Sequence, residues 1–284
     1  IRHSTLLFVK QAPGMAPKAK RIVTWNINSV RLRLPIVLRL LEEMKPDVLC
    51  LQEIKCTNEQ FPADAIAEAG YPHQALNGIK AYHGVATVSR EPFADVQIKS
   101  WCGKEDGRHV MTVLGDGTEL HNFYIPAGGD VPDREENDKF AHKLDFVAEL
   151  TGYWDERRSE NGLKAIMVGD LNIAPLETDV WSHKQLLKVV SHTPVETEAL
   201  TRTQNGLPWI DAVRHFIPAE EKLYSWWSYR ARDWSAADKG RRLDHIWVTK
   251  ALGGGRQGAG VLRDARGWEK PSDHAPVWLD IALD

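Results

Sequence analysis

The sequence has few cysteines, no excess of basic residues and no long apolar run. Its three cysteines, Cys50, Cys56 and Cys102, are odd in number and lack metal-ligand spacing, which is typical of buried thiols in a reducing compartment. The 36 basic and 39 acidic residues give a formal net charge of −3, so an anionic partner would need a local basic patch or a metal ion. No apolar run approaches the length of a membrane span, so we expect no membrane partner.

The composition is otherwise that of a globular chain. Of its 284 residues, 43% are hydrophobic and 26% are charged, which is enough to bury a sizeable core. The first 20 residues contain no acid, and their apolar stretch at positions 6–9 is too short for a secretory signal. Because the sequence lacks an initiator Met and contains Met15, we expect residues 1–20 to be a disordered or vector-derived extension, with a transit peptide as the alternative.

From residue 21 onward, apolar periodicity predicts strands that alternate with helices. We expect strands at 22–27, 47–54, 109–114, 119–125, from 165, 243–249 and 276–282, and helices at 34–44, 61–69, 134–158 and 184–190. The glycines at 253–255 and 258–260 predict a flexible loop. Hairpins mixed with crossover helices favour mixed sheets, so we predict one α/β domain over residues 21–284.

One predicted strand ends in a carboxylate and a carboxamide. The apolar run at 165–168 is followed by Gly169, Asp170, Leu171 and Asn172. Asp170 and Asn172 are two residues apart, so in an extended backbone both side chains point to the same side. Such a pair can take a proton from a water molecule and hold that water in place.

Two other strand ends carry candidate metal ligands. Glu53 follows a core strand, where a carboxylate is costly unless it is paired or binds a cation such as Mg²⁺. The alternative is a solvated turn residue paired with Lys55. Asn26 ends the first strand beside Asn28 and could reach a metal or a water, although Asn also commonly ends strands and caps turns.

The C-terminal third carries further polar candidates. Asp273 and His274 lie between two prolines, and an adjacent Asp fits an oriented imidazole that acts as acid, base or phosphate ligand. Asp244 could protonate or orient a leaving oxygen. The neighbouring Arg241 and Arg242 could contact phosphate, with a surface salt-bridge cluster as the alternative, and we single out Arg242.

Aromatic side chains complete the set of candidates. The segment at 224–230 is rich in aromatics and ends in Arg230, which suits stacking of Trp226 on a sugar or base beside a phosphate contact. An edge strand packed on the core is the alternative. Tyr124 could donate its hydroxyl to a phosphoryl oxygen, or be a buried structural tyrosine.

Taken together, these segments resemble the exonuclease III family of bacterial apurinic/apyrimidinic endonucleases, within the endonuclease/exonuclease/phosphatase superfamily. The resemblance covers residues 21–284 in the family's order, through the segments WNIN, PDVLCLQEIK, DGR, YIP, GDLN, YSWWSYR, RRLDH and PSDHAPV. It implies a four-layered α/β sandwich in which two mixed β-sheets pack face to face and are flanked by helices.

The resemblance also implies a role for each matched residue. Metal binding is implied for Glu53 and Asn26, and handling of the attacking water for Asp170 and Asn172. The remaining roles are phosphate contact by His274 oriented by Asp273, phosphate contact by Tyr124, a leaving-group role for Asp244, and substrate binding by Trp226, Arg230 and Arg242.

The sequence departs from the family pattern at three places. Ala127 follows the YIP segment, where relatives commonly carry Gln or Asn able to touch phosphate. At 211–214 small apolar residues replace a hydroxyl and aromatic pair, and Asp238 stands where Asn is usual. None of these changes falls on the implied metal-and-water residues.

The function implied is a Mg²⁺-dependent DNA repair nuclease, with Mn²⁺ as a substitute ion. It would cut 5′ to abasic sites, degrade DNA as a 3′–5′ exonuclease and trim 3′ ends. We expect a cytoplasmic monomer that acts on double-stranded DNA. The alternatives are a phosphatase or phospholipase of the same superfamily, and a nucleic-acid-binding regulator that has lost catalysis.

Overall fold

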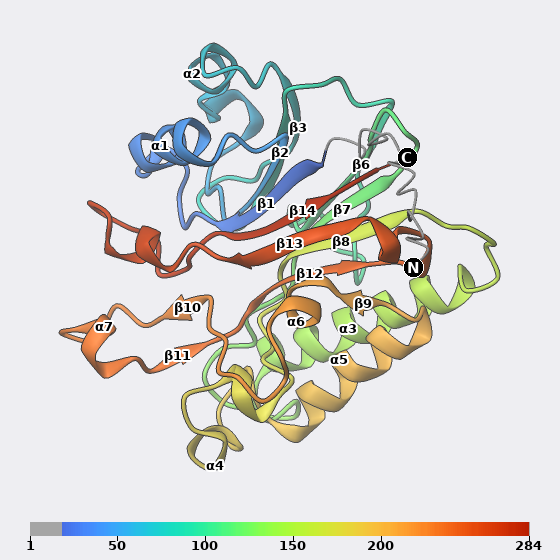
Figure 1. Cartoon of the computed structure of the whole chain (residues 1–284). Coiled ribbons are helices and arrows are strands. Elements are labelled where there is room, and N and C mark those ends of the chain that lie inside the picture. The colour runs from blue at the N-terminus through green and yellow to red at the C-terminus, as the bar shows by residue number, and fades with distance from the viewer. Residues whose placement is uncertain (1–18, 284) are drawn as a thin grey trace, which may run out of the picture.

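Two six-stranded mixed sheets face each other and are covered by helices on their outer sides (Figure 1). The computed structural model describes residues 19–283, so the extension expected over 1–20 lies almost wholly outside the described residues. No helix within the described range is long and apolar enough to cross a membrane. Helices α1 and α2 lie over one sheet, and α3 and α5 lie over the other. This arrangement confirms the predicted four-layered sandwich.

Sheet A joins strands from both ends of the chain. Its order is β13 (Arg256–Val261), β14 (Val277–Ile281), β1 (Lys20–Asn26), β2 (Val48–Gln52), β4 (Val85–Ser89) and β3 (His73–Asn77). The order in sheet B is β5 (Asp95–Gln97), β6 (His109–Val113), β7 (Glu119–Tyr124), β8 (Ala165–Asp170), β12 (Asp244–Val248) and β9 (Ile210–Asp211). A separate ribbon pairs β10 (Trp226–Trp227) with β11 (Gly240–Arg241).

The helices connect and cover these sheets. They are α1 (Leu34–Met44), α2 (Ala63–Glu68), α3 (Asp138–Glu156), α4 (His183–Leu186), α5 (Pro194–Gly206), α6 (Ala212–Phe216) and α7 (Trp234–Ala237). Short 3₁₀ turns are η1 (Asn58–Gln60), η2 (Glu177–Asp179), η3 (Lys250–Gly255) and η4 (Arg263–Gly267).

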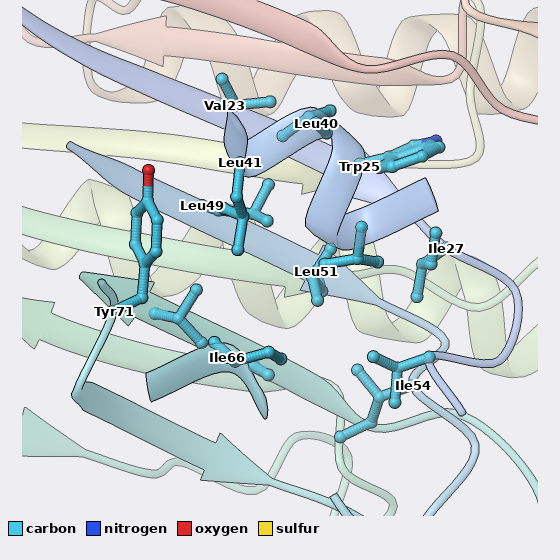
Figure 2. Close-up of a cluster of buried hydrophobic side chains, with 14 of the residues drawn as sticks. Val23, Trp25, Ile27, Leu40, Leu41, Leu49, Leu51, Ile54, Ile66 and Tyr71 are labelled. Atoms are coloured by element: carbon cyan, nitrogen blue, oxygen red, sulfur yellow. The ribbon is translucent and has the colours of Figure 1, made fainter. Parts of the chain in front are cut away.

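The central strands are apolar on both faces because both faces are covered. On β1, Ile22 packs between the two sheets, whereas Val23 and Trp25 pack toward α1. Figure 2 shows this outer layer, in which Leu40 and Leu41 of α1 lie against the strand side chains. Successive residues of a strand point to opposite faces, so a strand buried on both sides reads as a continuous apolar run.

Strand register brings the predicted polar residues to one end of the sandwich. In the parallel pairs, Asn26 lies beside Gln52 and Tyr124 lies beside Asp170. In the antiparallel pair of β8 with β12, Asp244 lies opposite Asp170. Residues that are far apart in the sequence therefore end their strands at the same place.

Gly169 makes this close approach possible. Its φ is 138°, and a Cβ atom at this position would lie 1.9 Å from the carbonyl oxygen of Phe123 on β7. No side chain fits there, so the glycine allows β8 to bring Asp170 against the end of β7.

The prediction of a flexible loop at 253–260 is wrong. This segment forms η3 and then β13, which pairs with β14 at the edge of sheet A. A Cβ at Gly260 would lie 3.2 Å from the indole nitrogen of Trp278, so the small residue fits against an indole of the adjacent strand. Sequence periodicity also missed α5 and strands β3, β4 and β5, and the helix expected at 184–190 is only the short α4.

Candidate active site

A cavity of about 590 Å³ lies at the end of the sandwich where the central strands of both sheets terminate. Its wall includes Glu53 directly after β2, Asp170 at the end of β8, and His274 just before β14. Asn172 and Trp226 also line it. With Asp273 and Arg230, which also line it, seven of the predicted residues therefore share one space.

Asp170 is held by hydrogen bonds on both of its oxygens. Oδ1 accepts from the backbone N–H of Asn172 at 3.0 Å, and Oδ2 accepts from Nδ2 of Asn26 at 2.8 Å. Burial, opposed by the nearby His274 and reinforced by Asp244, raises the pKa of Asp170 to about 7. Asp170 is therefore a carboxylate that can take up a proton near neutral pH.

Asn172 turns its carboxamide toward the cavity from a left-handed backbone. Its φ is 53°, a conformation that Asn tolerates better than most residues. Nδ2 donates to the carbonyl of Ile125 at 2.9 Å, and Oδ1 has no partner among residues 19–283. The free oxygen can accept a hydrogen bond from a water molecule beside Asp170.

His274 is a buried imidazolium between two carboxylates. Its Nδ1 lies 2.8 Å from Oδ2 of Asp244, and its Nε2 lies 3.7 Å from Oδ2 of Asp170. Burial alone would lower the pKa of His274, but Asp244 and Asp170 outweigh it and raise the pKa to about 10. The ring is therefore protonated at neutral pH.

Asp244, and not Asp273, orients this imidazole. The prediction for Asp273 is wrong, because its oxygens accept from Nδ2 of Asn28 at 3.1 Å and from the indole nitrogen of Trp226 at 2.9 Å. The leaving-group position predicted for Asp244 also disagrees with the structure. Asp244 is 1% exposed, is absent from the cavity wall, and binds the hydroxyl of Ser225 besides the imidazole.

Glu53 is held between a phenol, a carboxamide and an ammonium group. Its Oε1 accepts from Nδ2 of Asn26 and from the hydroxyl of Tyr124, each at 2.9 Å, and its Oε2 lies 2.8 Å from Nζ of Lys55. Burial alone would raise the pKa of Glu53, but Lys55 and Asn26 lower it below its usual range. The expected pairing with Lys55 does occur, but the carboxylate lines the cavity and is not a solvated turn.

Asn26 and Tyr124 act on Glu53 in different ways. Asn26 donates from one nitrogen to both Glu53 and Asp170, while its Oδ1 accepts from the backbone N–H of Asn28. Its oxygen therefore has one of its two lone pairs in use within the chain, and metal binding by Asn26 stays a prediction. Burial and the two carboxylates hold the pKa of Tyr124 well above its usual value, so the phenol keeps its proton.

The cavity offers oxygen ligands that suit a hard divalent cation. Among the described residues, Asp170, Asp244 and His274 form a group whose ligand atoms all lie within 4.8 Å of one another. The imidazolium of His274 carries a proton on each ring nitrogen and donates Nδ1–H to Asp244, so it offers no lone pair to a metal. The acidic side of the cavity, where Glu53 faces it, could hold such an ion.

The predicted arginines separate into two environments. Arg230 is exposed and lines the cavity. Arg242 is 2% exposed, with Nε 2.9 Å from Asp179 and Nη1 2.6 Å from Asp211, so its predicted phosphate contact is wrong. The salt-bridge alternative holds for Arg242, although the cluster is buried and not on the surface. Arg241, its neighbour in sequence, lines the cavity instead.

A model of the endonuclease/exonuclease/phosphatase family matches residues 23–274, which include every cavity residue described above. The chain belongs to the endonuclease/exonuclease/phosphatase family. This family member is 30% identical to exodeoxyribonuclease III of Haemophilus influenzae over 92% of its own length and 99% of that protein. It matches the AP endonuclease of Archaeoglobus fulgidus with a TM-score of 0.84 at 31% identity, over 92% and 99% of the two chains.

A second solved structure is equally similar to this chain. It is a 3′ phosphatase from Neisseria bound to a product DNA hairpin, with a TM-score of 0.85 and 31% identity, over 93% of this chain and 99% of that one. Hydrolysis of phosphate esters is the chemistry that these proteins share. The chain is accordingly a phosphodiester hydrolase.

A buried ion pair that the sequence pattern did not single out supports the site. Lys143 of α3 and Glu196 of α5 form an ion pair in which neither side chain is exposed. Nζ of Lys143 also donates to the backbone carbonyls of Ala127 at 3.2 Å and Asn172 at 2.8 Å. The signal was present, because Lys143 lies three residues after Phe140 and three before Phe146, on the buried face of α3.

Proposed function

We propose that this chain is a Mg²⁺-dependent DNA repair nuclease that hydrolyses the phosphodiester 5′ to an abasic site, with 3′–5′ exonuclease and 3′-end-trimming activity. The observation that carries the proposal is the 3.7 Å approach of the Asp170 carboxylate and the His274 imidazolium at one cavity wall. The carboxylate can accept a proton from a water molecule, and the fixed imidazolium can stabilise negative charge on a phosphate that this water attacks.

The protonation states assign the roles within the reaction. Asp170 accepts a proton from the water, since His274 is already protonated and cannot. The water oxygen forms a bond to phosphorus while the bond from phosphorus to the 3′ oxygen breaks, and the electron pair leaves on that oxygen. The oxygen of Asn172 aligns the water.

A fixed donor stabilises the charge that develops on the phosphate. Nε2–H of His274 is held in place before substrate arrives, so little reorganisation is needed. The single proton of the Tyr124 hydroxyl is donated to Glu53, so this phenol positions the carboxylate. A Mg²⁺ ion at Glu53, with Mn²⁺ as a substitute, would supply further neutralisation of the phosphate when bound. Trp226 walls the cavity where an abasic sugar would enter, and Arg230 adds a positive charge at its rim.

The test is incision of a duplex that carries one abasic site, with Mg²⁺ and with chelator. The proposal expects cutting by the wild type that is lost with chelator, restored in part by Mn²⁺, and reduced at least about a thousandfold by Asp170→Asn. Tyr229→Phe is the matched control, because its hydroxyl contacts Arg33 and the Pro271 carbonyl on the exterior.

Two results would overturn the proposal. Tight binding of DNA without cutting would indicate a regulator that has lost catalysis. Hydrolysis of inositol phosphates or phospholipids without cutting of DNA would indicate a phosphatase or phospholipase.

The same proposal includes a monomer that acts on double-stranded DNA in the cytoplasm. Support comes from a site whose residues all belong to one chain. Light scattering at working concentrations with and without an abasic duplex measures the stoichiometry, and two chains on one site would contradict it. Fractionation of the source cells checks the location.

A further inference from the structure

An exposed arm, residues 228–239, connects the two strands of the small ribbon. It contains α7, and none of its residues is buried. Figure 1 shows α7 at the outer end of β10 and β11, away from both sheets. Within the described residues, strand pairing holds the arm only at its two ends, through the pairing of β10 with β11. Side-chain contacts must therefore hold the rest of the arm in place.

Two arginines of η4 supply these contacts. The guanidinium carbon of Arg266 lies 5.3 Å from the ring centre of Trp234 in α7. The guanidinium carbon of Arg263 lies 5.4 Å from the ring centres of both Trp234 and Trp227, and the two indoles meet edge to face at 5.2 Å. A guanidinium at these distances from an aromatic ring makes an attractive cation–π contact. We call these four residues the arginine–tryptophan cluster.

Hydrogen bonds fix the direction of both guanidinium groups. Arg266 is 4% exposed, and its Nη2 donates to the carbonyl of Trp227 at 3.2 Å. Nη2 of Arg263 donates to Oδ1 of Asp238 at 3.0 Å, and the same oxygen accepts from the indole nitrogen of Trp227 at 2.9 Å. Asp238, which departs from the family pattern, therefore ties the end of the arm both to η4 and to the ribbon.

The arm carries positive charge to the cavity that it borders. Ser228 and Arg230 at its start and Lys239 at its end line the cavity wall. Lys239 lies over the ring of Trp181 at 4.6 Å. Among residues 19–283, Arg230 makes one hydrogen bond, from its backbone N–H to the hydroxyl of Ser228, and its side chain makes none. The place of Arg230 is therefore set by the arm and not by contacts of its own side chain.

We propose that Arg263 and Arg266 are positioning residues for DNA binding, which hold the arm against η4 and so place Arg230 at the cavity rim. They change the affinity for DNA through Arg230 and take no part in hydrolysis. Arg266 is too deeply buried to reach a DNA phosphate itself. This inference rests on the proposed nuclease function.

The first test measures binding and catalysis separately. Anisotropy of a labelled abasic duplex in chelator gives Kd, and incision with Mg²⁺ gives kcat. Arg230→Gln should weaken binding about tenfold and lower the slope of log Kd against log salt concentration by about 0.9, the value for one phosphate contact. Arg266→Met should raise Kd about three- to tenfold and leave kcat within about twofold of the wild type, because it displaces Arg230 without touching the reacting groups.

The second test asks whether the cluster acts through Arg230. Arg266→Met and Arg263→Gln are each combined with Arg230→Gln. Groups that act through one another are not additive, so neither double variant should bind more than about 1.5-fold more weakly than Arg230→Gln alone. A direct DNA contact by Arg263 would instead add its own loss of affinity and its own reduction of the salt slope.

Arg90→Gln is the matched control. Arg90 is an exposed arginine whose guanidinium carbon lies 5.2 Å from the ring centre of Tyr71, beyond the end of β4 that is remote from the cavity. The substitution removes an arginine and a cation–π contact, but nothing that touches the arm. Kd and kcat should both stay at the wild-type values.

Different results overturn the inference and the proposed function. Wild-type Kd in both cluster variants, or losses that add to that of Arg230→Gln, refutes the positioning role. Arg263, whose side chain is 46% exposed, decides this even if Arg266→Met fails to fold. Failure of the wild type to bind and cut the abasic duplex refutes the nuclease function instead.

Discussion

The chain buries two charged clusters that differ in how completely their hydrogen bonds are filled. The first, here called the closed cluster, is Lys143 and Glu196 with the groups they bind. Nζ of Lys143 has three acceptors for its three N–H bonds. The oxygens of Glu196 accept from the Lys143 ammonium, from two backbone N–H groups and from the Thr193 hydroxyl. Nothing in this cluster is left to bind a ligand.

The second, here called the open cluster, is Asp170, Asp244 and His274. Oδ1 of Asp244 has no partner within the described residues, and Nε2 of His274 approaches Asp170 only to 3.7 Å. The pKa values of both Asp170 and His274 are raised. The comparison teaches that buried charge alone does not mark an active site, whereas buried charge with unused capacity beside a cavity does.

The two clusters are also joined. Lys143 donates to the carbonyl of Asn172, whose backbone N–H donates to Asp170. The closed cluster thus fixes the loop that carries Asn172, the residue that we propose aligns the water beside the open cluster. Substitutions in the closed cluster should change the stability of the protein, and substitutions in the open cluster should change its activity.

The largest effect should come from Asp170→Asn in the open cluster. Incision should fall at least about a thousandfold, equivalent to about 4 kcal/mol of activation free energy. Because the folded state raises the pKa of Asp170, the ionised carboxylate lowers stability above pH 7, and Asn removes that cost. Urea unfolding at pH 8 should show a free energy of unfolding equal to or higher than that of the wild type. A loss of stability above about 1 kcal/mol would contradict the view that the open cluster serves activity and not stability.

The next largest effect should come from Lys143→Met in the closed cluster. Removal of the ammonium leaves Glu196 buried without its cation, which costs about 3–5 kcal/mol. Urea unfolding measures this loss. The double variant Lys143→Met with Glu196→Gln, which buries no charge, should recover much of it. A loss below about 1 kcal/mol for the single variant would mean that the cluster is not needed for stability.

The third effect concerns the pH dependence of stability, in which His245 and His274 differ. Burial lowers the pKa of His245 to about 4, whereas the pKa of His274 is raised. His245 is neutral when folded and takes up a proton when unfolded below pH 6.5. The neutral, buried His245 therefore contributes about 3 kcal/mol to the free energy of unfolding above pH 6.5, and this contribution is lost as the pH falls toward 4. Unfolding between pH 7 and pH 4.5 should show a smaller loss for His245→Gln than for the wild type.

The smallest effect should come from Asp273→Asn, set against Asp244→Asn. Asp244 holds the imidazole of His274, so its loss should lower kcat about tenfold to a hundredfold and lower the pKa of His274. Asp273 binds Asn28 and Trp226, and Asn keeps an oxygen for one of them, so kcat should fall less than about fivefold. An NMR titration of His274 distinguishes the variants, and equal shifts in both would refute the assignment to Asp244.

The sequence predicted the strand ends that carry the site but not the contacts between them. Asp170, Asn172 and Glu53 lie at or just after the ends of apolar strands, and carboxylates at such places are visible as a pattern, whereas His274 precedes an apolar strand. The partner of His274 was not visible, because Asp244 lies 30 residues away and becomes a neighbour only through the ribbon and β12. Proximity in sequence favoured Asp273, whose side chain faces Asn28.

The sequence also left open which of two adjacent side chains faces the cavity. Arg241 and Arg242 are adjacent, so one must face the cavity and the other must face away. Which one does so depends on the pairing of Arg241 with Trp226, and a two-residue strand has no periodicity that reveals it. The glycines of β13 misled for a related reason, because their space is filled by Trp278 of the next strand.

The position of β14 between β13 and β1 has a consequence for how the protein is made. Synthesis places Asn26, Glu53 and Asp170 on the chain well before His274, which directly precedes β14. A nascent or truncated chain that stops before residue 274 contains Asp170 but lacks both His274 and β14, and its sheet A is divided between β13 and β1. We therefore expect the growing polypeptide to be inactive on DNA until residue 274 and the last strand have been synthesised and have joined the sheet.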